Sequence, residues 1–397
     1  MNILYIQYAG DFLEAYTRLY VNGGSENYYG QKYSVDTVVK QARSNADIIE
    51  VLVLHTDQYY RTELEKNLTV VGLGKGKTIY SDVFKEIGVF IPERVILRMP
   101  DVKILKFLRR KSILTFPIFA DSFEVSGLIR GQLYRYLLSR ELKSSSVQWI
   151  ANHQINAAIS IKKLGIDSKK ILPYDWEHSD TPLNWDKNIP DDFETKEIIV
   201  FFAGSISKSK GVFDLVSAIQ YVHEAKRKII VKIAGKGEQE NLANLAKEQG
   251  VRDSVEFLGL IDHSEVLEYM NMADIVVTPS HHSYPEGLPM TIMESLMVHT
   301  PVIASDHPMF LGRVGGRGAV EFFQEKNSKD LANKIISLCG DIGEYKKRCN
   351  NAPLEWNDLI LKLKWGEMIN LWLKDSSHDF IKSSLYEIEK IDELGGN

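Results

Sequence analysis

Short apolar runs of strand length alternate with segments of helical periodicity along nearly the whole chain. This alternation is typical of parallel α/β architecture, in which helices connect successive strands. In the first half the predicted strands are residues 3–7, 48–54, 94–97, 113–119 and 148–151. In the second half they are residues 198–203, 229–234, 255–258, 274–278, 301–304 and 319–323. We therefore predict an α/β chain whose two halves are alike in architecture.

The segment from Trp176 to Lys196 interrupts this pattern with prolines and polar residues and has no apolar period. A chain of 397 residues also exceeds what one hydrophobic core usually organises. We predict an N-terminal domain over 1–183, a C-terminal domain over 184–372 and a separate end over 373–397. In that end, a helix from Phe380 to Leu394 is expected to bury a stripe of apolar residues, namely Ile381, Leu385, Ile388 and Ile391.

The composition is that of a soluble globular protein, with 44% apolar and 25% charged residues. The apolar N-terminus reaches Gly10 and Asp11 too soon for a signal peptide, and no later run approaches the length of a membrane span. Cys339 and Cys349 lack metal-ligand spacing and are expected to be free thiols in a reducing compartment. We expect a cytoplasmic protein.

Charge is distributed unevenly, with 24 Lys and Arg against 20 Asp and Glu through Leu183, and 24 against 33 beyond it. Between Lys103 and Lys111, five basic residues interleave with apolar ones. Such a segment suits a helix lying on an anionic membrane surface, but because it is short an ordinary amphipathic helix with solvated cations explains it better. Peripheral contact of the N-terminal domain with the inner membrane surface is therefore one of two interpretations. Nothing in the sequence predicts a nucleic-acid partner.

The loop from Gly204 to Gly211 follows one predicted strand and leads into a helix beginning near Val212. Glycines, a helix N-terminus and the cation of Lys210 together suit a diphosphate. The spacing is not that of a Walker loop, and no GxGxxG motif is present. Alone, this loop is as well explained by a solvated turn.

A second group of residues follows the predicted strand that ends at Thr278. Pro289 fits the first turn of the next helix, where the amides of Gly287, Leu288 and Met290 can face an anion. Glu286 precedes this helix and Glu294 lies within it, and both belong to the carboxyl edge of the sheet, where ligands of open α/β sheets bind. Carboxylates there can accept hydrogen bonds from sugar hydroxyls, although single glutamates are more often solvated.

At these residues the chain resembles glycosyltransferase family 4, a group of retaining GT-B enzymes. The two glutamates are separated by seven residues in a matching context, and the resemblance extends over about 198–306. It is carried by Gly204, Lys210-Gly211, Ala234-Gly235-Lys236-Gly237-Glu238, Leu258-Gly259, Pro279-Ser280, Glu286-Gly287-Leu288-Pro289, Glu294-Ser295-Leu296 and Thr300-Pro301-Val302-Ile303-Ala304. Such ordered motifs at strand ends are far more specific than any one of them.

The resemblance implies a GT-B fold: two Rossmann-like domains with parallel sheets facing across a cleft, and a C-terminal helix crossing back to the N-terminal domain. It implies that Lys210 neutralises the donor diphosphate, that Glu294 binds the ribose and that Glu286 holds the transferred sugar. Gly204, Gly235 and the amides after Gly287 would approach the phosphates. A hexosyl group would pass with retention from a UDP or GDP sugar to a hydroxyl of a glycan, lipid-linked sugar or small molecule. No cofactor and no metal would be needed.

The chain departs from the family pattern in two places. Ser205 stands where the family usually has an arginine after the first glycine of the phosphate loop, and a serine supplies neither the charge nor the planar fork. Ala120-Asp121 stands where many members have histidine and aspartate, which leaves Asp121 either facing the reacting sugar or capping the segment that follows.

The first half matches the family more loosely. Gly24 belongs to a glycine pair resembling the family's turn after the first strand, where an amide approaches the donor, and a plain flexible turn explains it nearly as well. Arg98, at a predicted strand end, is a candidate anion contact. His281 and His282 are weak evidence for a metal. A noncatalytic nucleotide-sugar-binding homologue and another GT-B enzyme, such as an epimerase, remain alternatives.

Overall fold

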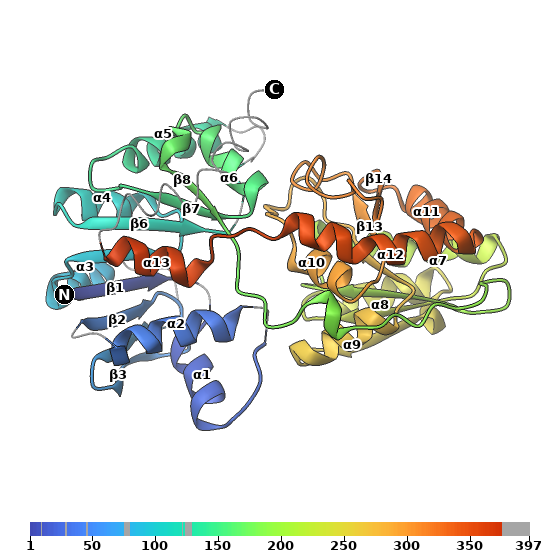
Figure 1. The fold of residues 1–397 in the computed structure, drawn as a ribbon, viewed down its shortest axis with the longest axis horizontal. Coiled ribbons are helices and arrows are strands. Elements are labelled where there is room, and N and C mark those ends of the chain that lie inside the picture. The colour runs from blue at the N-terminus through green and yellow to red at the C-terminus, as the bar shows by residue number, and fades with distance from the viewer. Residues whose placement is uncertain are drawn as a thin grey trace. The chain divides into compact units, whose positions relative to one another are not determined.

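The computed structural model describes residues 1–8, 10–27, 30–44, 47–74, 80–120, 122–123 and 129–374. The described residues form two compact units, of which the first contains Met1–Glu177 and the described part of the chain after Ile360, and the second contains His178–Ile360 (Figure 1). The units change at 177/178 and 360/361, ahead of the positions 183/184 and 372/373 expected from the sequence. Asp121 and the predicted helix from Phe380 to Leu394 lie outside the described residues.

The first unit is built on an eight-stranded sheet in the order β3-β4-β2-β1-β5-β6-β7-β8, parallel except where β3 pairs with β4. Its strands are β1 (Asn2–Gln7), β2 (Ile48–Val53), β3 (Tyr59–Glu65), β4 (Leu68–Leu73), β5 (Arg94–Leu97), β6 (Leu114–Phe119), β7 (Ile150–His153) and β8 (Ile171–Tyr174). Its helices are α1 (Phe12–Tyr16), η1 (Thr17–Val21), α2 (Gln31–Ser44), α3 (Tyr80–Phe90), α4 (Val102–Arg110), α5 (Ile129–Leu142), α6 (Ile155–Lys162), η2 (Ser168–Lys170) and α13 (Trp365–Leu373).

Both faces of this sheet are covered. Along β1, Ile3 and Tyr5 pack with α1, α2 and α13, whereas Leu4 and Ile6 pack with α3, α4, α5 and α6. Alternate side chains of a strand point to opposite faces, so a strand covered on both sides must be apolar throughout. This explains why the central strands appear in the sequence as continuous apolar runs.

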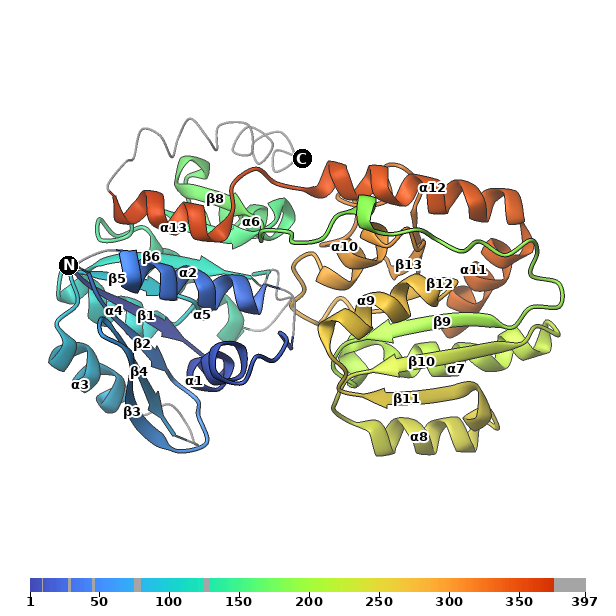
Figure 2. The same cartoon turned by 60° about the horizontal axis from the view of Figure 1, so that its bottom comes forward.

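The second unit has a six-stranded parallel sheet in the order β11-β10-β9-β12-β13-β14. Figure 2 shows β11, β10 and β9 side by side in this sheet. Its strands are β9 (Ile198–Ala203), β10 (Ile229–Ala234), β11 (Val255–Gly259), β12 (Ile275–Thr278), β13 (Val302–Ser305) and β14 (Val320–Phe323). Helices α7 (Val212–Glu224), α8 (Gln239–Glu248) and α11 (Ser328–Gly340) pack on one face. Helices α9 (His263–Met272) and α10 (Met290–Met297) pack on the other. Helix α12 (Ile342–Leu359) contributes to both cores, with Tyr345 and Cys349 on the first face and Ala352, Trp356 and Leu359 on the second. Three short 3₁₀ turns are η3 (Pro182–Asn184), η4 (Lys208–Lys210) and η5 (Arg252–Ser254).

Asp175 anchors the returning chain to the first unit. It is fully buried, and its carboxylate accepts from the Leu361 amide at 3.2 Å and lies 3.3 Å from Lys364 Nζ. Its backbone also pairs with the returning strand, since the Trp365 amide donates to its carbonyl at 2.9 Å. Removing a partner from a buried charge costs more than an exposed ion pair contributes. These contacts determine that α13 belongs to the first unit.

Three strands of the first unit were not predicted: β3, β4 and β8. Strand β3 is an edge strand of polar composition whose residues alternate between exposed and half-buried, so it lacks the apolar run of a central strand. Strand β7 begins at Ile150 and extends to His153, later than the predicted 148–151. In the second unit, all six strands lie where the sequence predicts them, within a residue or two at each end.

Candidate functional site

The candidate donor site lies where strand order reverses in the second unit. From β9 the chain passes to β10 on one side, and β12 pairs with β9 on the other. The connections that leave the carboxyl ends of these two strands diverge, and open α/β sheets bind ligands at such switch points. Lys210 follows β9, whereas Glu286 and Glu294 follow β12.

The loop after β9 is held tightly against its neighbours. Ser207 caps η4 by accepting from the Lys210 amide at 3.3 Å. Gly211 then adopts a left-handed φ of 72°, and a Cβ at this position would collide with the carbonyl of Pro279 in the loop after β12. Only glycine allows this approach. The backbone therefore presses the Lys210 loop against the loop that carries Glu286.

The side chains of Lys210 and Glu286 meet directly. Lys210 Nζ donates to Glu286 Oε1, and Ser280 Oγ donates to the same oxygen at 2.6 Å. The Glu286 side chain is only 8% exposed and the Lys210 side chain 17%, so the pair is largely shielded from solvent. The ammonium of Lys210 also lies 4.4 Å from the centroid of the Tyr284 ring. The structure thus brings together two of the three charged residues that the sequence predicts.

Glu294 has a separate partner. It sits within α10, is 5% exposed and contacts Nε2 of His263 through Oε1 at 2.6 Å. His263 is the first residue of α9, directly after Asp262, whose side chain caps that helix. The carboxylate of Glu294 is therefore oriented by a histidine at the N-terminus of α9. Its partner differs from that of Glu286, so the two glutamates have distinct environments.

Histidines tie the loop after β12 to the surrounding elements. His281 Nε2 contacts Asp214 of α7 at 2.6 Å, and the His281 amide donates to the carbonyl of Ser209 at 2.9 Å. Burial lowers the pKa of His307 below its usual value, which favours a neutral ring. That ring accepts from the Met309 amide at 3.1 Å through Nδ1, so Nε2 carries the proton and donates to the carbonyl of Tyr284 at 3.1 Å. The loop is therefore fixed before any ligand arrives.

The glycine-rich loops after β9 and β10 are joined by backbone hydrogen bonds. The Gly204 amide donates to the carbonyl of Ala234 at 3.0 Å, and the Gly235 amide to that of Gly259 at 2.7 Å. A Cβ at Gly235 would collide with the carbonyl of Gly204. Ser205 is exposed in this region. The N-termini of α7 and α10 lie at the same edge of the sheet. Their free backbone amides and the Lys210 ammonium could together bind an anion.

The site residues predicted in the first unit have different surroundings. Gly24 does not directly follow β1, because α1 and η1 intervene, and its amide donates to the carbonyl of Arg18 at 2.8 Å. Arg98 donates to Gln7 Oε1 at 3.0 Å and stacks 5.1 Å from the centroid of the Trp365 ring. Asp121, the remaining predicted catalytic residue, is outside the described residues.

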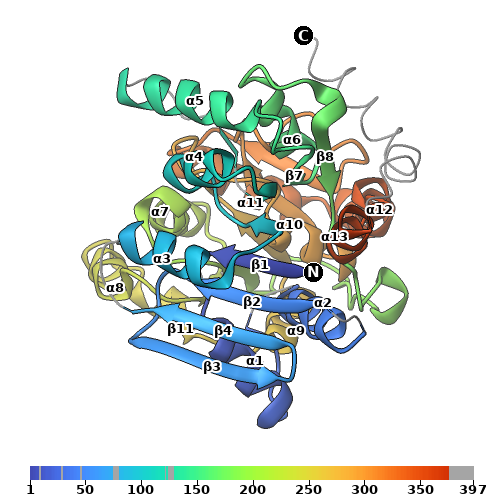
Figure 3. The ribbon, with the colours of Figure 1, turned by 90° about the vertical axis from the view of Figure 1, so that its left-hand side faces the viewer.

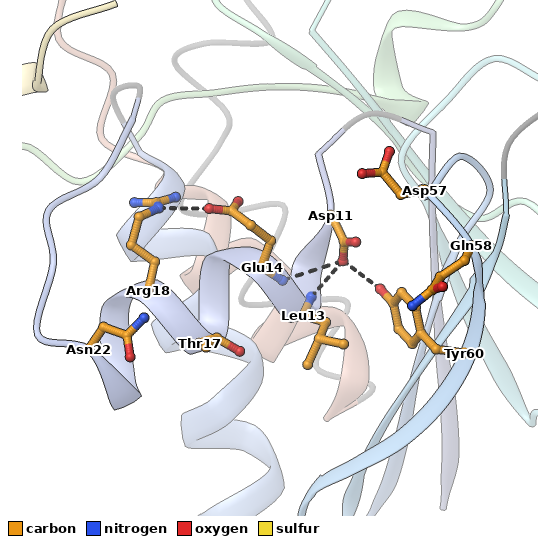
Figure 4. Close-up of a pocket in the computed structure, with 9 residues that line it drawn as sticks. All are labelled: Asp11, Leu13, Glu14, Thr17, Arg18, Asn22, Asp57, Gln58 and Tyr60. Carbon is orange, nitrogen blue, oxygen red and sulfur yellow. Dashed lines mark hydrogen bonds and ion pairs between the residues drawn. The ribbon is translucent and has the colours of Figure 1, made fainter.

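A polar cavity of about 440 Å³ lies beside α1 in the first unit (Figure 4). Its lining includes Asp11, Glu14, Arg18, Asn22, Asp57 and Tyr60. Burial and the adjoining Asp11 raise the pKa of the Tyr60 hydroxyl, which donates to that carboxylate. The cavity offers carboxylate and amide groups, which form hydrogen bonds with hydroxyl-bearing ligands.

The part of the chain that holds the candidate donor site is similar to known glycosyltransferases. Residues 185–355, which carry all the charged residues of the candidate donor site, match the family model of glycosyl transferases group 1. The chain is 32% identical over 125 residues to the O-antigen biosynthesis glycosyltransferase WclY of Escherichia coli, covering 31% of this chain and 32% of that protein.

It is also 27% identical over 223 residues to a Campylobacter jejuni N,N'-diacetylbacillosaminyl-diphospho-undecaprenol alpha-1,3-N-acetylgalactosaminyltransferase, covering 55% and 56% of the two chains. The match thus spans only about a third to a half of these curated relatives.

Solved structures match over nearly the whole length. Sucrose-phosphate synthase from Thermosynechococcus elongatus superposes with a TM-score of 0.69 at 15% identity, covering 96% of this chain and 100% of that one. Anabaena HepE in complex with UDP and glucose superposes with a TM-score of 0.65 at 15% identity, covering 94% and 98%. The fold is GT-B. The predicted fold class, with two Rossmann-like α/β units, is confirmed.

Sequence reasoning missed the partners that orient the two glutamates of this GT-B chain. Ser280 contacts Glu286, and His263 contacts Glu294. Ser280 stands at a strand end in the sequence, which is a signal of a ligand-facing position. His263 lies four residues after Gly259, which ends one of the motifs that carry the resemblance. Its pairing with Glu294 depends on how α9 and α10 pack, which no spacing in the sequence reveals.

The two cysteines are buried, and the described residues show neither a cluster of metal ligands nor a membrane-spanning helix. Cys339 and Cys349 are buried free thiols, and burial raises the pKa of Cys339 to about 12 and that of Cys349 to about 11. Within the described ranges, no group of three or more His, Cys, Asp or Glu side chains is placed to hold a metal ion. None of the helices described has both the length and the apolar character needed to cross a bilayer.

Proposed function

We propose that this GT-B chain is a retaining glycosyltransferase of family 4 that transfers a hexosyl group from a UDP or GDP sugar to a hydroxyl acceptor. The contact between Lys210 and Glu286 at the switch point between β9 and β12 carries this proposal. In it, Lys210 and the amides after Gly287 stabilise the leaving diphosphate, which is electrostatic catalysis by preorganised charge. Glu286 holds the sugar and Glu294 the ribose. Gly204, Ser205 and Gly235 line the approach to the phosphates.

The Lys210–Glu286 pair gives the site two functions. A diphosphate competes with the carboxylate for the ammonium, so Lys210 is already oriented toward the place where negative charge arrives. When the diphosphate draws Lys210 away, the Glu286 carboxylate can accept a hydrogen bond from a hydroxyl of the sugar being transferred. Retention is proposed to follow a front-face departure, with the leaving phosphate accepting the acceptor proton. No protein nucleophile is then required, and the proposed role of Asp121 is to face the reacting sugar.

The acceptor is proposed to bind in the first unit, where the polar cavity beside α1 presents Asp11, Glu14 and Asp57 to hydroxyl groups. A glycan or lipid-linked sugar is the class that we favour. The Campylobacter jejuni relative is named for a diphospho-undecaprenol substrate, and the Escherichia coli relative for O-antigen biosynthesis. We propose that such an enzyme acts in the cytoplasm, at the inner surface of the membrane.

A transfer assay tests this function. UDP-glucose, UDP-galactose, UDP-N-acetylglucosamine and GDP-mannose are each incubated with the protein and a panel of glycan, lipid-linked and small hydroxyl acceptors. We expect one donor to yield nucleoside diphosphate and a glycosylated product in equal amounts, with the anomeric configuration of the donor. Nucleoside diphosphate release or sugar isomerisation without any acceptor consumed would instead indicate another GT-B activity, such as an epimerase.

Chelation should leave transfer intact, because the proposed stabilisation of the leaving diphosphate comes from Lys210 and backbone amides rather than from a bound cation. The measurement is the initial rate with and without EDTA, followed by titration of Mg²⁺ or Mn²⁺. Loss of the rate with EDTA and its recovery with a divalent ion would contradict metal independence. It would direct attention to His282, which contacts Asp306 and Glu325.

A noncatalytic nucleotide-sugar-binding role is the second candidate, favoured by Ser205 and by Ala120 in place of the family's arginine and histidine. Ser205→Arg tests it. Ser205 is exposed, so the larger arginine side chain fits without a steric clash. It is expected to raise affinity for nucleoside diphosphate by about tenfold, the effect of one charged hydrogen bond. Isothermal titration measures it, with Ser209→Arg in the same loop as control. Weaker binding by a folded Ser205→Arg protein would mean that this loop is built for another phosphate geometry.

A further inference from the structure

Arg98 lies at a second reversal of strand order, in the sheet of the first unit. Strand β1 lies beside β2, to which the chain passes next, and pairs with β5 on its other side (Figure 3). The carboxyl ends of β1 and β5 therefore flank a switch point, where open α/β sheets bind ligands. Gln7 is the last residue of β1. Arg98 follows directly on β5, and its amide donates to the carbonyl of Ile6 at 2.9 Å.

The Arg98 guanidinium is held in place by uncharged groups. Its Nη1 donates to Gln7 Oε1 at 3.0 Å, and Gln7 is itself fixed, since its Nε2 donates to the carbonyl of Gly10 at 2.7 Å. The central carbon of the guanidinium lies 5.1 Å from the centroid of the buried Trp365 ring. These contacts orient the cation without neutralising its charge.

Arg98 also differs from other arginines of the first unit in its charge environment. Several of them pair with a carboxylate, namely Arg18, Arg43, Arg61, Arg109 and Arg140. Among the described residues, Arg98 has no such partner, although its side chain is half-buried. Partial burial removes water from a cation, which costs free energy unless a counter-charge takes its place. The remaining N–H donors of Arg98 can therefore serve an anion that a ligand brings.

The loop after β1 connects this cation to the polar cavity beside α1. Gly10, at the end of the hydrogen-bond chain from Arg98, directly precedes Asp11. Asp11, Glu14 and Asp57 all line the cavity (Figure 4). Their carboxylates accept hydrogen bonds from hydroxyl groups and repel a phosphate. A ligand that has both groups would place its hydroxyls in the cavity and its phosphate on Arg98.

We propose that Arg98 binds a phosphate group of the acceptor and so selects acceptors whose sugar is linked to a phosphate or diphosphate. The planar fork of a guanidinium matches two oxygens of a phosphate, which a glutamine or a lysine cannot reproduce. The assignment to an acceptor rests on the proposed transfer function, whereas an anion site at Arg98 does not. Uncharged hydroxyl acceptors would lack this contact.

Isothermal titration with inorganic pyrophosphate tests the site without any transfer reaction. The unaltered protein should bind pyrophosphate at both switch points. Lys210→Ala should weaken one of these sites and Arg98→Gln the other, each by about ten- to a hundredfold, the effect of a charged hydrogen bond. Arg98→Lys keeps the charge and loses the fork, so its affinity should lie between those of Arg98→Gln and the unaltered protein. The double variant Lys210→Ala, Arg98→Gln should show neither site.

Arg110→Gln is the matched control, because Arg110 is exposed on α4 of the same unit and carries the same charge change. It should keep both pyrophosphate sites. Unfolding midpoints without ligand show whether Arg98 has only a structural role. Such a role predicts a lower midpoint for Arg98→Gln with pyrophosphate binding unchanged, and that result would overturn the proposal.

Kinetics assign the phosphate to the acceptor. With a sugar acceptor linked to a prenyl diphosphate, Arg98→Gln should raise the acceptor KM about ten- to a hundredfold and leave the donor KM unchanged. Affinity for UDP and GDP should also stay unchanged. Its loss in Arg98→Gln would assign the anion to the donor and overturn the proposal. If Lys210→Ala kept both pyrophosphate sites while Arg98→Gln lost one, the donor assignment would fail and the Arg98 site would stand.

Discussion

Lys210→Ala is expected to lower kcat/KM by about a hundred- to a thousandfold, the effect of removing one preorganised group that stabilises charge in a transition state. The ammonium is the cation that contacts Glu286 at the proposed donor site, and it faces the loop whose amides would bind the same diphosphate. Affinity for the bare nucleoside diphosphate should fall as well, because that charge is present in the ground state too. Steady-state kinetics and isothermal titration measure the two effects.

Loss of Lys210 also leaves the buried Glu286 carboxylate without its cation, and removing one partner of a buried pair destabilises a protein by about 3 to 5 kcal/mol. The double variant Lys210→Ala, Glu286→Gln removes this charge and separates instability from lost chemistry. Lys208→Ala is the matched control, since Lys208 lies in the same 3₁₀ turn, is exposed and should be dispensable. Unchanged kinetics in a folded Lys210→Ala protein would refute the phosphate assignment.

Glu294→Ala and Glu286→Gln are expected to have opposite effects on bare nucleotide binding. Glu294, oriented by His263, is proposed to hold the ribose throughout the reaction, so its loss should weaken nucleoside diphosphate and nucleotide sugar by a similar factor. Glu286 is proposed to meet only the sugar. Glu286→Gln should therefore reduce turnover while nucleoside diphosphate binds at least as well, because Lys210 is released from its carboxylate partner.

The expected scale of each loss is about ten- to a hundredfold, which corresponds to a charged hydrogen bond of roughly 1.5 to 3 kcal/mol. Titration with nucleoside diphosphate alone, beside kinetics with the intact donor, distinguishes the two roles. His263→Ala supplies a control, since it should mimic Glu294→Ala in part and leave the sugar contact untouched. If both glutamate variants lost affinity for bare nucleotide equally, the division of labour between them would be wrong.

The fold of the second unit was predictable because its strands are buried on both faces. Residues such as Ile198, Val200 and Phe202 must be apolar there, so each strand stands out in the sequence. The edge strand β3 alternates between exposed and half-buried positions and carries Arg61, Thr62 and Glu63, so it resembles a loop in composition. The return of the chain at Leu361 depends on the buried Asp175, a contact between residues far apart in the sequence, which no local pattern contains.

The site was predictable as far as backbone topology determines it. Lys210, Glu286 and Glu294 follow the carboxyl ends of parallel strands, so they lie at one edge of the sheet. The motifs that carry the resemblance identify the loops and the helix that contain them. The direct pairing of Lys210 with Glu286, and of His263 with Glu294, arises from side-chain packing between loops. The insertion of α1 and η1 between β1 and Gly24 was likewise hidden, because a five-residue α-helix followed by a five-residue π-helix leaves little periodicity.

Every role proposed for Lys210, Glu286 and Glu294 requires that the second unit bind a nucleoside diphosphate, and a series of thermal unfolding measurements detects this binding. A ligand that binds only the folded state stabilises it, by about 2.7 kcal/mol at a hundred times its Kd. UDP, GDP, ADP and their sugar conjugates are compared at matched concentration on the unaltered protein and on Lys210→Ala. We expect UDP or GDP, with its sugar conjugates, to raise the unfolding midpoint, and Lys210→Ala to abolish most of the shift. No shift with any nucleotide, or a shift that Lys210→Ala leaves unchanged, would contradict this expectation.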